Sequence, residues 1–255
     1  MTEPICVFRR YSLMGCELSS IIRTNDIVAF HSFIEKYHNY ENTTEHLEPN
    51  TDMTTYNKYF NQTIAENIIC YPISNTDLMK ILINNYQFIP ENNFMKIFIP
   101  RMNFAMFKLF HDFFDVKKYV NQVHNIFIDA CEQDHLDHIK QLLAMGFDIN
   151  NLNKAKTYYH TGISHAISYR RYNIIEYLLD AGIDYKKYEA DILKQCIEHR
   201  DMKMIIIFLN RGASIDILNT QSNMPTRNTM EIYHLLDSHN IELPIILNLM
   251  IGQEY

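Results

Sequence analysis

Hydrophobic residues between residues 125 and 216 recur in a pattern that appears three times. In each copy, four apolar positions are spaced i, i+3, i+6 and i+7, which places them on one face of a helix. The three sets are Leu136, Ile139, Leu142 and Leu143; Tyr172, Ile175, Leu178 and Leu179; and Met202, Ile205, Phe208 and Leu209. We therefore expect one amphipathic helix in each copy, with this face buried.

A small residue precedes each of these ladders, and a glycine follows it. The small residues are Ala130, Ala166 and Cys196, and at one constant interval after them stand Gly146, Gly182 and Gly212. The chain has only 6 glycines, so half of them occupy this one position. A glycine directly after an apolar helix tolerates the left-handed backbone with which many helices end. The small-residue column indicates a further, closely packed helix in front of each ladder.

The amino-acid sequences of the three copies resemble the ankyrin repeat. HLDHIKQLLAMGFDIN, RYNIIEYLLDAGIDY and DMKMIIIFLNRGASID are similar to the second-helix half of that repeat. The family's T-P-L-H-x-A start survives in part: residues 161–166 keep its Thr, an apolar residue and its Ala. At the position of the motif's His, the three copies have Ile128, Ser164 and Lys194. The glycine intervals (182 − 146 = 36 and 212 − 182 = 30) lie on either side of the family's period of about 33 residues.

This resemblance implies an all-α, ankyrin-like helix-pair solenoid with degenerate terminal repeats. Because the Thr-Pro turn and its His normally brace neighbouring repeats, their loss implies less regular stacking. We expect about six or seven repeats in total. The expected organisation is residues 1–37 as a degenerate first repeat or cap, 38–62 as a polar insertion or linker, 63–240 as the repeat stack and 241–255 as an apolar tail.

The outer copies depart from the pattern mainly at the glycine position. Asn85 stands there in one copy, and asparagine is the residue that most readily replaces glycine in a left-handed backbone. Phe113 stands there in the next copy, and residues 229–240 repeat a second-helix ladder with His239 at this position. Near the N-terminus, Asn25-Asp26 predicts a turn and an N-cap between two helices.

Charge and cysteine usage narrow the class of protein. A net charge of −7 and a pI of about 5.9 argue against wholesale binding to nucleic acid or anionic membranes. The 5 cysteines are scattered without a C-x-x-C pair, which is typical of free thiols in a reducing compartment. Cys131 and Cys196 fall in or beside the small-residue column, so we expect them to be buried.

No apolar leader follows a basic start, and no run of about 18 apolar residues occurs, so the sequence favours a cytoplasmic protein. The abundance of Ile and Asn is similar to that of proteins coded by AT-rich genomes, including those of large DNA viruses. For a viral protein the corresponding compartment is the host-cell cytoplasm.

The sequence contains no pattern typical of catalysis or cofactor binding. It has no Walker loop, no G-x-G-x-x-G, no G-x-S-x-G and no kinase motifs. His135 and His138 are spaced i, i+3, but no further ligands are spaced to complete a zinc site. We expect no catalytic, cofactor-binding or metal-binding residues.

The turns between the predicted repeats share lysine and tyrosine. Together with His165 on a first helix, the candidate partner-binding residues are Lys117, Lys118 and Tyr119; Lys154, Lys156, Tyr158 and Tyr159; and Lys186, Lys187 and Tyr188. If the repeats stack in register, this edge would contact an acidic partner protein, with tyrosine supplying contact area and lysine steering. Two alternatives stay open: ordinary solvated turns, or a site for single-stranded nucleic acid, which the net charge disfavours.

We interpret the chain as a protein-binding scaffold without chemistry of its own. One alternative is an adaptor, because Leu243-Pro244, Leu247 and Met250 resemble the start of the F-box-like ends with which some viral ankyrin proteins recruit a ubiquitin-ligase component. The same tail could instead fold back over the last repeat. A structural component of a particle is a third possibility.

Overall fold

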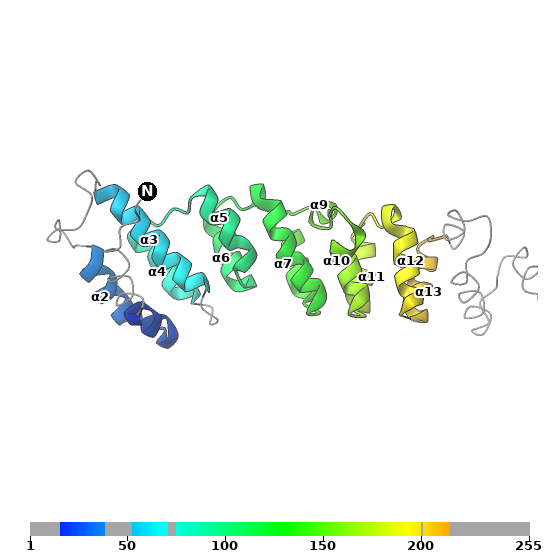
Figure 1. Ribbon diagram of the computed structural model, residues 1–255, viewed down its shortest axis with the longest axis horizontal. Helices are drawn as coiled ribbons and strands as arrows, with labels where there is room; N and C mark the ends of the chain where they lie inside the picture. Colours follow the sequence, from blue (N-terminus) through cyan, green and yellow to red (C-terminus); the bar gives the residue numbers. More distant parts are fainter. Residues whose placement is uncertain (1–15, 39–52, 71–74, 200, 215–255) are drawn as a thin grey trace, which may run out of the picture. The chain divides into compact units, whose positions relative to one another are not determined.

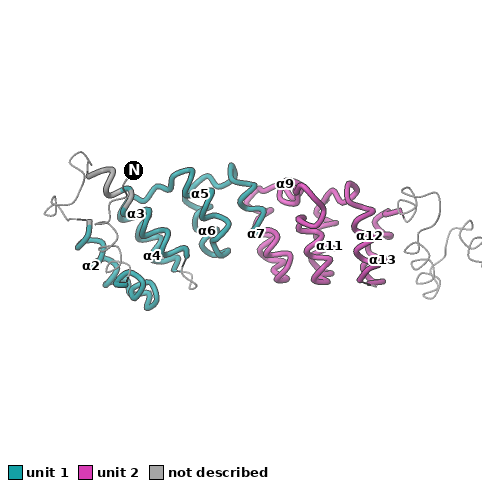
Figure 2. The backbone as a smooth tube through the Cα atoms, in the orientation of Figure 1, with its two compact units in different colours: residues 1–126 teal, residues 127–255 magenta. Residues whose placement is uncertain are grey.

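The computed structural model describes residues 16–38, 53–70, 75–199 and 201–214. The chain divides into two compact units, residues 1–126 and 127–255 (Figure 2). Within the described ranges every regular element is a helix (Figure 1), so the expectation of an all-α fold is confirmed. The predicted terminal repeat at 229–240 and the apolar tail at 241–255 lie outside these ranges.

The first unit consists of successive helices. A helix that includes residues 16–24 is followed by α2 (Ile27–His38), α3 (Met53–Cys70), α4 (Thr76–Tyr86), α5 (Asn92–Phe98), η1 (Ile99–Arg101), α6 (Phe104–Phe113) and η2 (Lys117–Tyr119). Helix α3 packs against α4 and α5, and α4 packs against α6. The predicted turn before α2 is present: Asn25 has a φ of 51°, and the Ala29 N–H donates to Asp26 Oδ1 at 2.9 Å.

Helix α3 corrects the prediction of a non-helical insertion over residues 38–62, because its first ten residues, 53–62, belong to that range. Phe60 is buried and its ring stacks on Phe33 at 6.5 Å. Asn61 is also buried, and its Nδ2 donates to the Tyr86 carbonyl at 3.0 Å. These contacts with residues distant in sequence stabilise a helix whose own polar composition gave no periodic signal. Residues 39–52 lie outside the description.

The helices of the first unit end without glycine. Helix α4 extends through Tyr86, so the left-handed residue is Gln87, with a φ of 52°, and the assignment of Asn85 was wrong by two positions. After α6 the chain becomes extended at Phe114, whose ring packs 5.4 Å from that of Phe110. Packing of this ring replaces the left-handed turn that the repeat pattern placed at Phe113.

The second unit contains the three regular copies. Helix α7 (Val120–Glu132) crosses the boundary between the units and is followed by α8 (Leu136–Ala144), α9 (Ile149–Leu152), η3 (Tyr158–His160), α10 (Gly162–Ser168), α11 (Tyr172–Asp180), η4 (Lys186–Tyr188), α12 (Glu189–Glu198) and α13 (Met202–Asn210). In Figure 1, α10 and α12 lie side by side, with α11 and α13 packed against them. The predicted ladders form the faces of α8, α11 and α13.

The ladder residues point into the core. Their most central members are fully buried, with 0% exposure: Ile139, Leu142, Ile175, Leu178, Ile205 and Phe208. Because each helix hides the same stripe against a neighbouring helix, the repeated pattern produces one continuous apolar layer through the unit.

The three glycines make the same helix-ending turn. Gly146, Gly182 and Gly212 have φ values of 86°, 82° and 82°. The N–H that follows each glycine bonds back over the last turn, as Ile183 does to the Leu178 carbonyl at 3.0 Å. This 6→1 bond satisfies a carbonyl that the helix end would leave unpaired. The glycine prediction is therefore confirmed at all three sites.

The small-residue column allows close helix packing. Ala130, Ala166 and Cys196 are all buried. At Gly162 the approach is closer still, because a Cβ there would lie 2.2 Å from Cε1 of the buried Phe127 ring. Cys131 and Cys196 are buried as expected, and burial raises the pKa of both thiols, so they remain protonated and unreactive.

Candidate partner-binding surface

The turns before the first helices of the second unit stack in register. Tyr158 in η3 and Tyr188 in η4 stand equally far before Ala166 and Cys196. Their ring centroids are 5.9 Å apart, and the Tyr188 hydroxyl donates to the Ala155 carbonyl at 3.3 Å. Successive tips therefore form one surface, as the repeat period predicted for this unit.

One tip is longer than the next. The interval from Gly146 to Tyr158 exceeds that from Gly182 to Tyr188 by six residues (158 − 146 = 12; 188 − 182 = 6). The extra length lies in residues 149–157, here named the tip insert, which comprise α9 and the loop after it. The insert explains why the two glycine intervals differ.

The tip insert is anchored at several points. Leu152 is fully buried, and the buried Asn153 accepts the Ile163 N–H through Oδ1 at 3.2 Å. Asn150 reaches the next repeat, where its Nδ2 donates to the Gly182 carbonyl at 3.2 Å and its Oδ1 accepts the Asp184 N–H at 2.6 Å. These bonds tie the insert to α10 and to the next repeat.

A polar network closes the base of the insert. The Tyr158 hydroxyl donates to Gln195 Oε1, and Gln195 Nε2 donates to Ser168 Oγ at 2.6 Å. Burial raises the pKa of Tyr158, so its hydroxyl keeps its proton and remains a donor. Thr161 caps α10 by accepting the Ser164 N–H at 3.2 Å, which gives the surviving Thr of the degenerate motif a structural role.

Two of the candidate tyrosines are structural. Tyr119 is 5% exposed and Tyr158 is 3% exposed, so their rings pack inside the protein and cannot supply the contact area expected of them. In the first unit the Tyr119 hydroxyl donates to Asn92 Oδ1 at 2.7 Å. Tyr188 is half-buried, whereas Tyr159 is 60% exposed. Tyr159 is the candidate ring that a partner can reach most fully.

The candidate lysines of the second unit also fall into two groups, one bonded to a carboxylate and one without an ionic partner. Lys186 Nζ lies 3.2 Å from Oε1 of the buried Glu189 and donates to the Gly212 carbonyl. Burial lowers the pKa of Lys186, but the hydrogen bond and charge of Glu189 together with Tyr185 outweigh it, and the pKa is raised. Lys154, Lys156 and Lys187 are exposed, and none of them forms an ion pair with a carboxylate of the described residues.

The remaining two candidate lysines belong to the first unit. Lys117 and Lys118 are exposed, and Lys118 Nζ lies over the Tyr119 ring at 5.3 Å from its centroid. Lys187 makes the same contact with Tyr188 at 4.9 Å. The repeated Lys-Lys-Tyr sequence thus places a lysine over a tyrosine ring in each unit.

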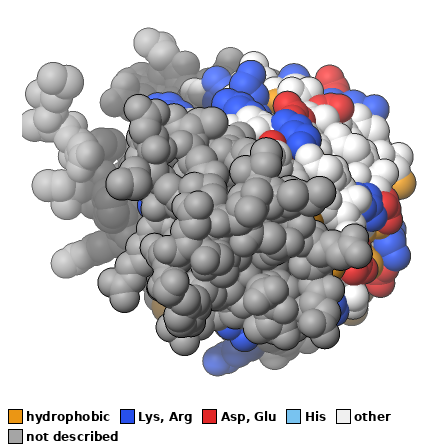
Figure 3. All heavy atoms as spheres, turned by 90° about the vertical axis from the view of Figure 1, so that its right-hand side faces the viewer, with side chains coloured by type: hydrophobic (Ala, Val, Ile, Leu, Met, Phe, Trp, Pro, Cys, Tyr) orange, Lys and Arg blue, Asp and Glu red, His pale blue; other side chains and the backbone are white. Residues whose placement is uncertain are grey.

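The tips carry both signs of charge. Asp148 and Asp184 are exposed beside the lysines, and Asp148 Oδ1 accepts the Asn151 N–H at 2.8 Å to begin α9. Figure 3, which views the molecule from the α13 side, shows lysine and arginine side chains along the upper rim with acidic side chains among them. At the tips of the second unit, the lysines without an ionic partner among the described residues are Lys154, Lys156 and Lys187.

His165 is engaged by a neighbouring repeat. Its Nδ1 lies 2.6 Å from Glu132 Oε1, and both side chains are only 25% exposed. Arg171 Nε donates to the Glu132 carbonyl at 2.8 Å. This arrangement links α7, α10 and α11, so we assign His165 a bracing role in place of the contact role expected from the sequence.

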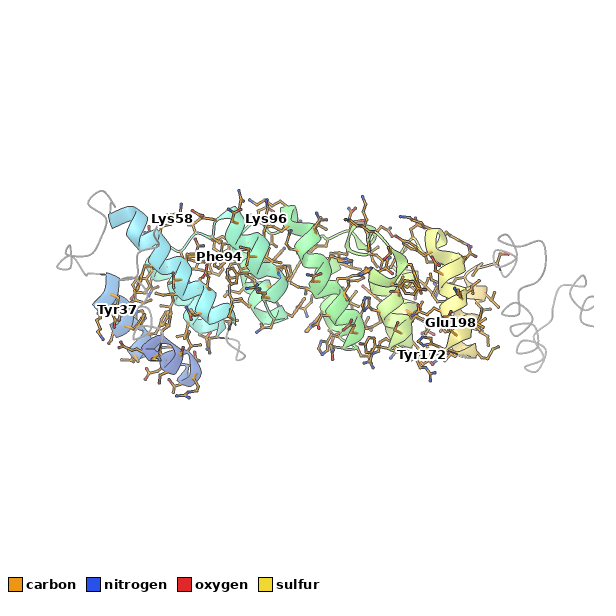
Figure 4. All side chains as sticks on the ribbon, in the orientation of Figure 1. Tyr37, Lys58, Phe94, Lys96, Tyr172 and Glu198 are labelled. Carbon is orange, nitrogen blue, oxygen red and sulfur yellow. The ribbon has the colours of Figure 1, made fainter. Side chains whose placement is uncertain are left out.

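A second cluster, which the sequence did not reveal, lies at the other end of the helices. Figure 4 shows Tyr172 at the end of α11 away from α9, and its hydroxyl donates to Asp201 Oδ2 at 2.8 Å. Asp201 is buried, caps α13 through the Met204 N–H at 3.1 Å, and lies 3.7 Å from Arg170 Nε. Its oxygens all have partners within the protein, so the cluster stabilises the turn.

Metal and membrane chemistry find no support in the described ranges. The described residues contain no group of three or more His, Cys, Asp and Glu side chains that could hold a metal ion. The rings of His135 and His138 are 4.7 Å apart, and burial and the neighbouring His135 lower the pKa of His138. No helix in this part of the chain combines the length and apolar character needed to span a membrane.

Comparison with known proteins agrees with this geometry. Residues 127–219 match the family model of ankyrin repeats, in three copies. An ankyrin repeat protein of Acanthamoeba polyphaga mimivirus is 25% identical over 133 residues, which cover 51% of this chain and 20% of that protein. The chain thus spans about a fifth of the length of this relative. No solved structure matches the chain.

Residues 127–219 therefore resemble three ankyrin repeats, and part of the chain is similar to a viral ankyrin repeat protein. The matched segment begins at Phe127, the first residue of the second unit. Ankyrin repeats are generally protein–protein interaction modules, and the family is typically non-catalytic.

Proposed function

We propose that the chain is a non-enzymatic scaffold that binds an acidic partner protein through the tips of its second unit. The observation that carries this proposal is that the exposed, ionically unpaired lysines Lys154, Lys156 and Lys187 share the tips of the second unit with the exposed ring of Tyr159. Lysines of this kind steer an acidic partner, and a tyrosine ring supplies rigid contact area.

The anchoring of the tip insert supports the proposal. The bonds made by Asn150, Asn153 and Tyr158 hold the loop before any partner arrives. A surface that is already ordered loses little conformational entropy when it binds, so more of the contact energy appears as affinity. Lys186 and His165 are engaged elsewhere in the same unit, by Glu189 and Glu132.

The same geometry favours a protein over single-stranded nucleic acid. Binding of single strands needs several exposed rings on which bases can stack, together with a strongly positive groove. Two of the candidate rings, Tyr119 and Tyr158, are buried, and Asp148 and Asp184 lie exposed beside the lysines. A mixed-charge tip with one well-exposed ring fits a folded protein surface better.

The test compares two charge reversals of equal size. Lys154→Glu with Lys156→Glu changes the tip insert, whereas Lys140→Glu with Lys203→Glu changes the second helices α8 and α13, where both lysines are also exposed. Affinity capture from the cells that make the protein, followed by quantitative mass spectrometry, should show an acidic partner reduced about tenfold on the first variant only.

Retention of that partner by the tip variant, or an equal loss with the control, would refute the proposal. Circular dichroism of both variants checks that the fold is kept. The same capture with residues 243–255 deleted separates a scaffold from an adaptor, because ligase subunits lost on this deletion alone would indicate the adaptor. Those residues lie outside the described ranges.

A further inference from the structure

The loop of the tip insert exposes a threonine that follows two lysines. Thr157 is exposed, and residues 154–157 lie outside any helix. Its backbone is extended, with φ −130° and ψ 155°. Lys154 and Lys156 stand three residues and one residue before it and are exposed as well.

We propose that Thr157 is a phosphorylation site for a protein kinase that selects basic residues before its acceptor, and that the phosphate weakens partner binding at the tip. Such a kinase holds the acceptor segment in an extended form and reads positive side chains through its own acidic residues. The second half of this inference rests on the proposed function, whereas the first half does not.

Three other exposed hydroxyls of the described residues are placed less favourably. Thr24 and Ser168 lie at the ends of helices, and their hydroxyls donate to backbone carbonyls of the preceding turn, each at 3.0 Å. Ser214 follows Arg211 by three residues, but that arginine lies 2.6 Å from Asp180 Oδ1 and the Ser214 N–H donates to Glu189. The carboxylates of Asp180 and Glu189 would repel the acidic residues with which such a kinase binds its substrate.

The Thr157 hydroxyl has a single side-chain partner, which a rotation about Cα–Cβ releases. Oγ1 lies 2.6 Å from Nδ1 of the exposed His160. In the modification, Oγ1 forms a bond to the γ-phosphorus of a nucleoside triphosphate as the bond to the β,γ-bridging oxygen breaks. The hydroxyl proton passes to the base of the kinase, and the nucleoside diphosphate leaves.

The phosphate would change the charge of the tip without unfolding it. A phosphothreonine carries about −1.5 to −2 charges at neutral pH, enough to offset Lys154 and Lys156 in the same loop. Asp148 and Asp184 would then leave the tip acidic. The anchors Tyr158 and Asn153 are buried and would keep the backbone in place. An acidic partner is therefore repelled from an otherwise intact surface.

The site is tested by treating the full chain with a basic-directed serine/threonine kinase and magnesium ATP, followed by peptide mass spectrometry. We expect one phosphoryl group on Thr157, its absence in Thr157→Val, and a rate about tenfold lower when Lys154 and Lys156 are both changed to Ala. An unmodified Thr157, or an unchanged rate in the double alanine variant, would overturn the assignment. This measurement needs no partner.

The switch is tested on the partner that the capture experiment identifies. Thr157→Glu should weaken its binding about tenfold, whereas the neutral, similarly sized Thr157→Gln should not. If the lysine reversal weakens binding but Thr157→Glu does not, the switch is wrong and the proposed function stands. If the lysine reversal has no effect, both fail, and the mass measurement alone decides the modification site.

Discussion

The two units bury helix pairs with different side chains. The first unit is built around phenylalanine: the Phe94 ring lies 5.4 Å from Phe88, 4.7 Å from Phe98 and 6.4 Å from Phe110. The second unit is built around aliphatic ladders, with Phe127 packed against Gly162 and Phe208 against the Tyr185 ring, 5.5 Å away. Large rings fill uneven spaces between helices of unequal length, whereas matched aliphatic ladders suit helices that repeat.

Both units bond a side chain of one helix pair to the backbone of another, as Asn75 Nδ2 does to the Ile22 carbonyl at 2.6 Å in the first unit. The units differ in that the second unit makes these bonds to the glycine turn of the next repeat or to the residue beside it. In the second unit, side chains of one repeat bond to backbone groups of the next, as Asn150 does to Gly182 and as the Tyr185 hydroxyl does to the Arg211 carbonyl at 2.7 Å. Such bonds need a constant helix-pair geometry, which the glycine turns provide. The comparison teaches that the regular period is what makes this unit recognisable as ankyrin repeats.

Removing a ladder ring from the second unit should have the largest effect. Phe208→Ala deletes a fully buried side chain and should lower the free energy of unfolding by about 3–5 kcal/mol. Phe113→Ala in the first unit removes a ring that is 44% exposed and should cost about 1 kcal/mol. Chemical denaturation of both variants measures the difference. Equal losses in the free energy of unfolding would show that the buried ladder is not what stabilises the second unit.

The second largest effect on stability is expected when one methyl group is added at Gly162. Its Cβ would meet Phe127 Cε1 at 2.2 Å, so Gly162→Ala should cost about 1–3 kcal/mol through overpacking. A second Phe127→Leu change should recover part of this loss by making room. Gly182→Ala is the control for backbone strain alone, because nothing lies within 4 Å of its Cβ position. An absence of recovery in the double variant would contradict the steric explanation.

Cutting one bridge between repeats should have a smaller effect. Asn150→Ala removes two hydrogen bonds to the next repeat and should lower stability by about 1–2 kcal/mol. Asn151→Ala changes the adjacent exposed asparagine and should cost less than about 0.5 kcal/mol. Thermal unfolding of the pair checks the difference. Identical midpoints would mean that the bridge adds nothing to the stacking.

The smallest effect should appear when the first unit is given a glycine turn. Gln87 has a φ of 52°, a conformation that is strained for residues with a side chain. Gln87→Gly should raise the free energy of unfolding by about 0.5–1 kcal/mol, since relief of the strain exceeds the added freedom of the unfolded chain. A stability below that of the parent protein would show that the Gln87 side chain contributes packing that outweighs the strain.

The sequence was sufficient wherever one local pattern decided the outcome. The ladder spacing predicts which side of α8, α11 and α13 is buried, and the glycines predict where these helices end, because both depend on residues within two helical turns. The same reasoning failed for residues 53–62. The signal there was not periodic, and contacts such as Phe60 with Phe33 and Asn61 with Tyr86 decided the helix.

The candidate partner-binding surface shows more clearly what the sequence could not predict. Lysine and tyrosine in a turn look alike in sequence, yet Tyr158 is buried against Gln195, 37 residues away, while the adjacent Tyr159 is exposed. Lys186 is bound by Glu189 and Gly212, while the adjacent Lys187 has no carboxylate partner among the described residues. Periodicity by itself determined that helix pairs stack; only the neighbouring repeat, brought close by that stacking, decided which turn residues face solvent.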